Sequence, residues 1–182
     1  MVKPRMTHIE ASRDAQLITG ILNEAFATVA ETFGFTRTNA PKFPAFIDSS
    51  VIQNQLDGDL TMFVCFCDGV PAGCAGYSPE SNKNVFAIER LGVLPAFRHL
   101  GIGRQLLTHC ERHIAASMPQ CSAKIYIVND NAVLKRWYTA MDYVQTNIIR
   151  QDGYPFDICV MEKQLYGAQA RPPRRNMNRE RT

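Results

Sequence analysis

The sequence predicts one domain of the α/β class, in which helices pack on a mixed β-sheet. Three observations support this fold class. Helical apolar spacing and short β-rich runs follow one another in the order helix, hairpin strands, strand, helix, strand, helix, strands. The middle portion, residues 84–128, has the pattern strand–helix–strand, a unit whose two strands run parallel through a right-handed crossover. The length of 182 residues and the apolar content of 46% suit a single hydrophobic core.

The N-terminal part of the chain begins with an amphipathic helix. Apolar residues recur at helical spacing over residues 13–30, from Leu17 to Phe26. Residues 31–48 contain two prolines and several phenylalanines, which predicts a loop-rich, partly packed segment. A short helix is expected near residues 47–57. The phenylalanines that could line an apolar pocket, or simply fill the core, are Phe33, Phe35, Phe43 and Phe46.

The remaining elements are short and strongly patterned. The run TMFVCFC predicts a strand over residues 61–67, and DGV at 68–70 is typical of a tight hairpin turn before a strand over 71–79. Helical spacing returns at 102–118 and again at 131–141. The further strands are expected at 84–93, 123–128, 143–149 and 156–163. On a regular strand, Ala87, Glu89, Leu91 and Val93 share one face.

Charge and cysteine content restrict the class of protein. The net charge is +3, but residues 171–182 hold five arginines and one glutamate, so the rest of the chain is near neutral. We therefore expect one domain over residues 1–168 and a basic, disordered tail over 169–182; a nucleic-acid tether is the alternative for the tail. Six scattered cysteines without a C-x-x-C pair predict no metal site and fit a reducing, cytoplasmic setting. No apolar run is long enough for a signal peptide or a membrane span.

The segment RHLGIGRQLL, residues 98–107, places two glycines where a helix begins. The first backbone N–H groups of a helix have no partner inside the helix, and the helix dipole adds partial positive charge there. Glycines let an anion approach these groups without meeting a Cβ atom, and Arg98 and Arg104 could add charge. The dinucleotide pattern fails because position 106 is leucine, and no G-K-[ST] triplet occurs. A phosphate site and a simple tight turn both remain open.

Wider context distinguishes these two interpretations. The segment IERLGVLPAFRHLGIGRQLL resembles the acyl-CoA-binding segment of the GNAT superfamily of N-acetyltransferases, whose pattern [QR]-x-x-G-x-[GA] is filled by Arg98, Gly101 and Gly103. The segment NAVLKRWYTAMDY is similar to a second family pattern, with Asn131 and Tyr138 in place and Asp142 where the family has glycine. The resemblance covers most of residues 5–165 and is specific from 85 to 143.

The resemblance implies a GNAT-like fold with splayed central parallel strands, and it implies a co-substrate, acetyl-CoA, with no metal. The pantetheine arm would lie in the gap between the strands, against the backbone of Leu91 and Val93 and against Asn131. The pyrophosphate would be held by the N–H groups of the turn and the first helical residues, namely Arg98, His99, Leu100, Gly101, Ile102, Gly103 and Arg104.

The implied reaction is direct attack of an amine on the acetyl group in a ternary complex. Deprotonating an alkylamine of pKa about 10.4 costs about 4.6 kcal/mol at pH 7, whereas releasing a thiolate of pKa about 8.5 costs about 2 kcal/mol. Glu89 is therefore our candidate base, acting directly or through water, with a structural ion pair to Arg90 as the alternative. Tyr138 is the candidate acid, and packing beside Trp137 is its alternative role.

The acceptor itself is not encoded in these motifs. We expect a small-molecule amine or a peptide, bound over residues 27–48, the strand at 73–79 and the loop at 150–156. A non-catalytic acyl-CoA-binding sensor or regulatory module is the alternative function. Neither a membrane nor nucleic acid is an expected partner, and a homodimer stays open.

Overall fold

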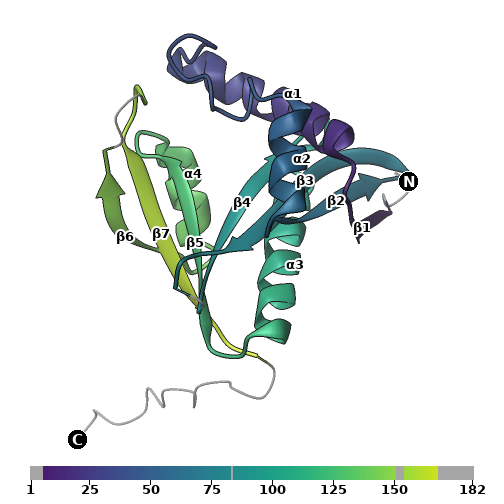
Figure 1. Cartoon of the computed structure of the whole chain (residues 1–182), viewed down its shortest axis with the longest axis vertical. Helices are drawn as coiled ribbons and strands as arrows, with labels where there is room; N and C mark the ends of the chain where they lie inside the picture. The colour runs from purple at the N-terminus through teal and green to yellow at the C-terminus, as the bar shows by residue number, and fades with distance from the viewer. Residues whose placement is uncertain (1–5, 83, 151–153, 168–182) are drawn as a thin grey trace, which may run out of the picture.

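The computed structural model describes residues 6–82, 84–150 and 154–167 of the chain. The basic tail predicted at 169–182 lies outside the described residues. One seven-stranded sheet organises the domain, in the strand order β1-β2-β3-β4-β5-β7-β6. The predicted class, a mixed sheet flanked by helices, is confirmed (Figure 1). In chain order the elements are β1 (Thr7–Ala11), α1 (Ala15–Phe33), α2 (Ser49–Asp57), β2 (Thr61–Cys67), β3 (Val70–Pro79), β4 (Val85–Val93), the short 3₁₀ helix η1 (Pro95–Phe97), α3 (Ile102–Ser117), β5 (Cys121–Val128), α4 (Ala132–Thr139), β6 (Val144–Ile149) and β7 (Ile158–Leu165).

Local sequence signals set the boundaries of α1 and of the first hairpin. The Asp14 carboxylate accepts a hydrogen bond from the N–H of Leu17, and this cap starts α1. Gly34 ends the helix in the left-handed conformation, so α1 runs a turn further than residue 30. Asp68 and Gly69 both have positive φ in the predicted tight turn between β2 and β3.

Strand β1 is the one strand of the described sheet that the sequence did not predict, and the short helix η1 was not predicted either. Its five residues pair with β2 in antiparallel register, from Thr7 opposite Cys67 to Ala11 opposite Phe63. No residue of β1 is fully buried, so the strand has no apolar run to reveal it. Pairing with the edge of β2 forms this strand, and that interaction is non-local.

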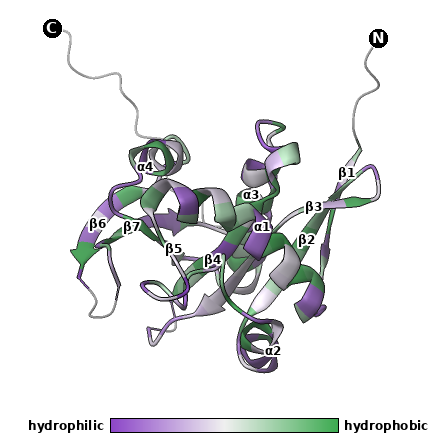
Figure 2. Cartoon of the chain, turned by 90° about the horizontal axis from the view of Figure 1, so that it is seen from above, coloured by the Kyte–Doolittle hydropathy of each residue, from purple (hydrophilic) through white to green (hydrophobic). Residues whose placement is uncertain are grey.

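Helices cover both faces of the sheet, and Figure 2 shows α4 and α2 on opposite sides of it. On one face, α3 buries Leu106, Leu107 and Ile114 against strands β2 to β5. On the other face, α1 and α2 bury residues such as Leu22 and Ile52 against β2 and β3. No helix in the described part of the chain has the length and apolarity required to cross a membrane.

Candidate active site

The predicted strand–helix–strand unit pairs in parallel over only a short length. Residues Val85 to Ala87 of β4 align with Ser122 to Lys124 of β5, and the pairing ends there. Beyond this point the two strands separate, and Figure 1 shows the sheet opening between β4 and β5. The inner edges of both strands therefore face a cleft instead of each other.

Two adjoining cavities occupy this cleft. The helix-side cavity, of about 490 Å³, is lined by residues from α1, the end of β4, the start of α3 and α4. The loop-side cavity, of about 430 Å³, is lined by the middle of β4 and β5 and by residues 42–44 and 154–156. Leu91, Asn131, Leu134 and Tyr138 line both cavities, so a long molecule in one would reach the other.

The start of α3 forms one end of the helix-side cavity. Gly101 caps the helix with φ 78°, a conformation that favours glycine. The N–H groups of Ile102, Gly103 and Arg104 donate to no group among the residues that the structure describes. This turn therefore presents unpartnered donors and the positive end of the helix dipole.

Gly103 has a different reason to be glycine. A Cβ atom added there would meet Trp137 and Val93 at 3.6 Å, which is an ordinary contact. Protein packing therefore does not require glycine at 103, unlike the backbone conformation at Gly101. The missing side chain instead leaves the N–H groups open toward the cavity that Gly103 lines.

Arg98 serves this turn differently from the sequence prediction. Its guanidinium donates to the carbonyls of Ala25 and Val93 and to the Thr28 hydroxyl, at 2.8, 3.3 and 2.9 Å respectively. Its backbone N–H donates to the Pro95 carbonyl at 3.3 Å. The prediction that the Arg98 N–H belongs to the open anion-binding run is wrong, because that N–H closes η1; its side chain ties the turn to α1.

Strand β4 contains a bulge that changes which residues share a face. Glu89 lies opposite Gly76 and Gly92 opposite Cys74, so Arg90 and Leu91 both face Ala75, and Arg90 has φ 58°. Leu91 and Val93 consequently pack on the α3 face of the sheet. Arg90 instead bonds Gln55 of α2 at 3.1 Å on the opposite face. The expectation that Ala87, Glu89, Leu91 and Val93 share one face is therefore wrong.

Glu89 lines the loop-side cavity as a partly exposed carboxylate. Its Oε1 atom accepts a hydrogen bond of 2.6 Å from the Ser78 hydroxyl. Its Oε2 atom lies 3.9 Å from Nε of Arg90, too far for a hydrogen bond. The ion pair with Arg90 thus exists but leaves Oε2 able to accept another donor.

Tyr138 extends from α4 to the junction of the two cavities. Its ring packs edge-on against Trp137 and Tyr143, with centroids 4.7 and 5.5 Å away. Its hydroxyl makes no hydrogen bond with any described residue. Burial raises the pKa of Tyr138 well above its ordinary value, so the phenol stays protonated and can donate.

Asn131 lies at the same junction as the N-cap of α4. Its side-chain oxygen accepts a hydrogen bond of 3.0 Å from the N–H of Leu134. Its amide NH₂ group therefore remains as a hydrogen-bond donor for a molecule in the cleft.

Aromatic residues form the outer wall of the loop-side cavity. Phe26, Phe43, Tyr154 and Phe156 line it, and Phe43 and Phe156 contact each other edge-on at 6.3 Å. Of the phenylalanines named from the sequence, Phe43 lines this cavity, whereas Phe33, Phe35 and Phe46 pack behind it in the same apolar cluster. The loop at 150–156 contributes Tyr154 and Phe156 as expected, and residues 151–153 lie outside the described residues. The strand at 73–79 does not line it.

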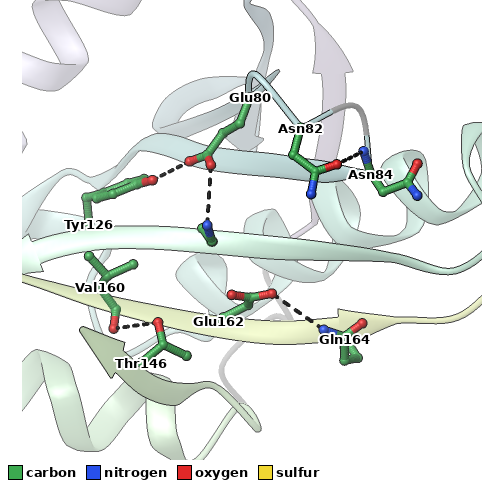
Figure 3. A network of polar contacts seen from close by, with 9 residues as sticks. Glu80, Asn82, Asn84, Tyr126, Thr146, Val160, Glu162 and Gln164 are labelled. Atoms are coloured by element: carbon green, nitrogen blue, oxygen red, sulfur yellow. Dashed lines mark hydrogen bonds and ion pairs between the residues drawn. The ribbon is translucent and has the colours of Figure 1, made fainter.

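A polar group that sequence reasoning missed borders the same cavity. The hydroxyl of Tyr126 on β5 donates a hydrogen bond to Glu80, whose other carboxylate oxygen lies 3.5 Å from Nζ of Lys124 (Figure 3). Tyr126 lines the cavity together with Glu89. The alternating polar positions 124 and 126 were the available signal, but Glu80 is brought near them only by the sheet.

Comparison with known proteins identifies the family. The sequence model of the acetyltransferase (GNAT) family matches residues 23–143, about two thirds of the chain. The chain belongs to the GNAT acetyltransferase family. No curated protein sequence matches it significantly.

Solved GNAT structures share the fold at low sequence identity. The ribosomal-protein-S18-alanine N-acetyltransferase from Escherichia coli has a TM-score of 0.66 and 16% identity, over 90% of this chain and 96% of that one. The PaiA N-acetyltransferase from Thermoplasma acidophilum, in complex with coenzyme A, has a TM-score of 0.64 and 16% identity, over 87% and 99%. The yncA protein from Salmonella typhimurium, with its cofactor acetyl-CoA, has a TM-score of 0.66 and 18% identity, over 94% and 99%.

The departure of this chain from the second GNAT pattern is local. Asp142 has φ 68° in the turn after α4, so a non-glycine residue occupies a left-handed position. Its side chain is exposed, and Tyr143 beside it is buried with its hydroxyl donating to Glu111 at 3.0 Å. The substitution therefore affects the end of α4 and leaves Tyr138 in the cleft.

Proposed function

We propose that this protein transfers an acetyl group from acetyl-CoA to a primary amine, by direct attack of the amine in a ternary complex. One observation carries the proposal: the cleft between the splayed strands β4 and β5 ends at the unpartnered N–H groups of α3. Membership of the GNAT acetyltransferase family supports it.

Acetyl-CoA fits the groups that the helix-side cavity presents. Its pyrophosphate is an anion, which the N–H groups from Ile102 to Arg104 and the helix dipole favour. The pantetheine arm is an extended amide chain that would lie along the open edge of β4 at Leu91 and Val93, opposite the amide group of Asn131. His99 and Leu100 belong to the same turn, and we assign them only backbone contacts.

The chain supplies groups for both proton movements of the reaction. The thioester of acetyl-CoA is the acetyl donor. Glu89 takes the proton of the incoming amine, directly or through a water molecule, because its Oε2 atom has no hydrogen-bond donor. Tyr138 donates its phenolic hydrogen bond toward the departing sulfur, since its raised pKa keeps the hydroxyl protonated.

We also propose that the protein works in a reducing compartment such as the cytoplasm. All six cysteines are buried, unpaired thiols. Such thiols persist where disulfides are reduced.

Two measurements on the full chain test the proposed function. Isothermal titration calorimetry reports CoA binding, and release of free thiol reports turnover of acetyl-CoA with a panel of amines. We expect binding and amine-dependent thiol release, and we expect Gly101→Glu to lose both while its circular dichroism spectrum stays folded. CoA binding without turnover of any amine would instead favour the non-catalytic sensor.

A further inference from the structure

We propose that the acceptor is a primary monoamine carried on an aromatic or similarly bulky apolar group, with its ammonium held between Glu89 and Tyr126 in the loop-side cavity. This inference rests on the proposed function, because it names the acceptor of that same site. It is carried by the two chemically different walls of one cavity.

The apolar wall consists of ring edges and faces contributed by three separate segments. Phe26 from α1 meets Phe43 at 5.6 Å, and Tyr154 meets Phe156 at 5.3 Å, each edge-on. Phe26, Tyr154 and Phe156 are only partly buried, so their surfaces remain available to a ligand. An aromatic body would complete this cluster with the same edge-to-face contacts that its members already make.

The polar end lies across the cavity on strands β4 and β5. The Tyr126 hydroxyl donates its hydrogen bond to Glu80, so its oxygen can only accept a hydrogen bond from a ligand. Oε2 of Glu89 likewise has no donor at hydrogen-bond distance among the residues that the structure describes. Two acceptors, one of them a carboxylate, would take two of the three N–H donors of a single ammonium group.

The balance of charge around the cavity argues for one amine and against several. Among the described residues, the acidic and basic side chains in the lining are Glu89, Arg90 and Lys42. Behind them Glu80 is already paired with Lys124, and the Glu162 carboxylate accepts a hydrogen bond from Gln164 (Figure 3). A polyamine would bring its further charges toward Lys42 and the apolar wall, where the described residues place no further carboxylate in the lining.

An acceptor panel tests the inference directly. Phenethylamine, propylamine and putrescine are compared by kcat/KM for thiol release at saturating acetyl-CoA. We expect phenethylamine to exceed propylamine and putrescine by at least about thirtyfold, because an apolar pocket discriminates strongly by the apolar surface that it buries. A preference for putrescine would overturn the inference, as would equal rates for phenethylamine and propylamine.

Variants locate the two walls. Phe156→Ala should raise KM for phenethylamine about tenfold and leave propylamine unchanged; Tyr154→Ala is the second variant should loss of Phe156 prevent folding. Tyr126→Phe should raise KM for phenethylamine about tenfold with kcat within about twofold, because it removes one hydrogen bond to an ammonium. Tyr166→Ala, an aromatic truncation at an exposed position outside the cleft, is the matched control.

Calorimetry with CoA separates the two levels of the proposal. If calorimetry detects no CoA binding to the unaltered protein, the proposed function itself is refuted. CoA binding with turnover of hydrophilic amines, or with no turnover of phenethylamine, would refute the acceptor class alone. Unchanged kinetics of both Tyr126→Phe and Phe156→Ala would show that the acceptor lies elsewhere.

Discussion

Gly103→Ala is the sharpest test of the anion-binding turn, because it should move stability and affinity in opposite directions. The added methyl group meets Trp137 and Val93 at 3.6 Å, so it fits the fold without displacing either residue. Replacing glycine by alanine in a helix stabilises it by up to about 1 kcal/mol. For a chain of this length that corresponds to a rise in Tm of about 2–4 °C.

The same methyl group would extend from a residue that lines the helix-side cavity, next to the unpartnered N–H groups of Ile102 to Arg104. Losing one charge-assisted hydrogen bond to a phosphate costs about 1.5–3 kcal/mol, or roughly 10- to 150-fold in the Kd for CoA. Thermal denaturation and isothermal titration calorimetry measure the two effects on the same sample. The control is Gly101→Ala, which should lower Tm because the φ of 78° strains any side chain. A Gly103→Ala protein with a raised Tm and unaltered Kd would refute our interpretation of this glycine.

Three further predictions concern the catalytic and buried groups. Tyr138→Phe should lower kcat by about 100-fold with the Kd for CoA unchanged; a normal rate in this variant would show that Tyr138 only packs. In the unaltered enzyme, kcat should show no alkaline decline from Tyr138 below pH 10, because burial raises the pKa of that phenol. Lys163→Met should destabilise the fold by about 3 kcal/mol in urea titrations, because Glu111 is buried and bonded to Lys163 at 2.9 and 3.0 Å; adding Glu111→Leu should recover part of this loss. Burial raises the pKa of the Cys74 and Cys110 thiols to about 12. The free energy of unfolding should therefore be unaffected by these thiols below about pH 8 and fall as the pH rises toward 12, by about 1–2 kcal/mol per thiol at pH 10. A Tm that stays constant between pH 8 and 10 would contradict the last of these.

Elements with local signals were predictable from the sequence. The hairpin turn at Asp68 and Gly69 has positive φ at both residues, and an Asp-Gly pair is typical of such a turn. The parallel pairing of β4 with β5 follows from the strand–helix–strand order alone. Gly101 and Gly103 lie where the apolar helical spacing begins, and α3 starts between them at Ile102.

Features that depend on pairing between distant segments were not predictable. The strand β1 is exposed and polar, so only its register with β2 defines it. The hydrogen bond between Tyr126 and Glu80 joins residues 46 positions apart, and no spacing rule links them. The side chain of Arg98 donates hydrogen bonds to Ala25 and Thr28, which lie 73 and 70 positions away in the chain. Each of these interactions exists because the sheet or a helix end brings two segments together.

The bulge at Arg90 explains how one strand can serve two chemical tasks. In the sequence VFAIERLGV only Gly92 is typical of a bulge, and no residue type marks Arg90 as the position with positive φ. Phe86 and Ile88 pack into the core beneath α3, so in a regular strand Leu91 and Val93 would share the opposite face with Glu89. The extra residue leaves Glu89 and Arg90 on the α1–α2 face and returns Leu91 and Val93 to the α3 face. The left-handed φ of Arg90 costs about 1–2 kcal/mol, and in return the group that we assign to the amine proton lies apart from the edge that we assign to pantetheine.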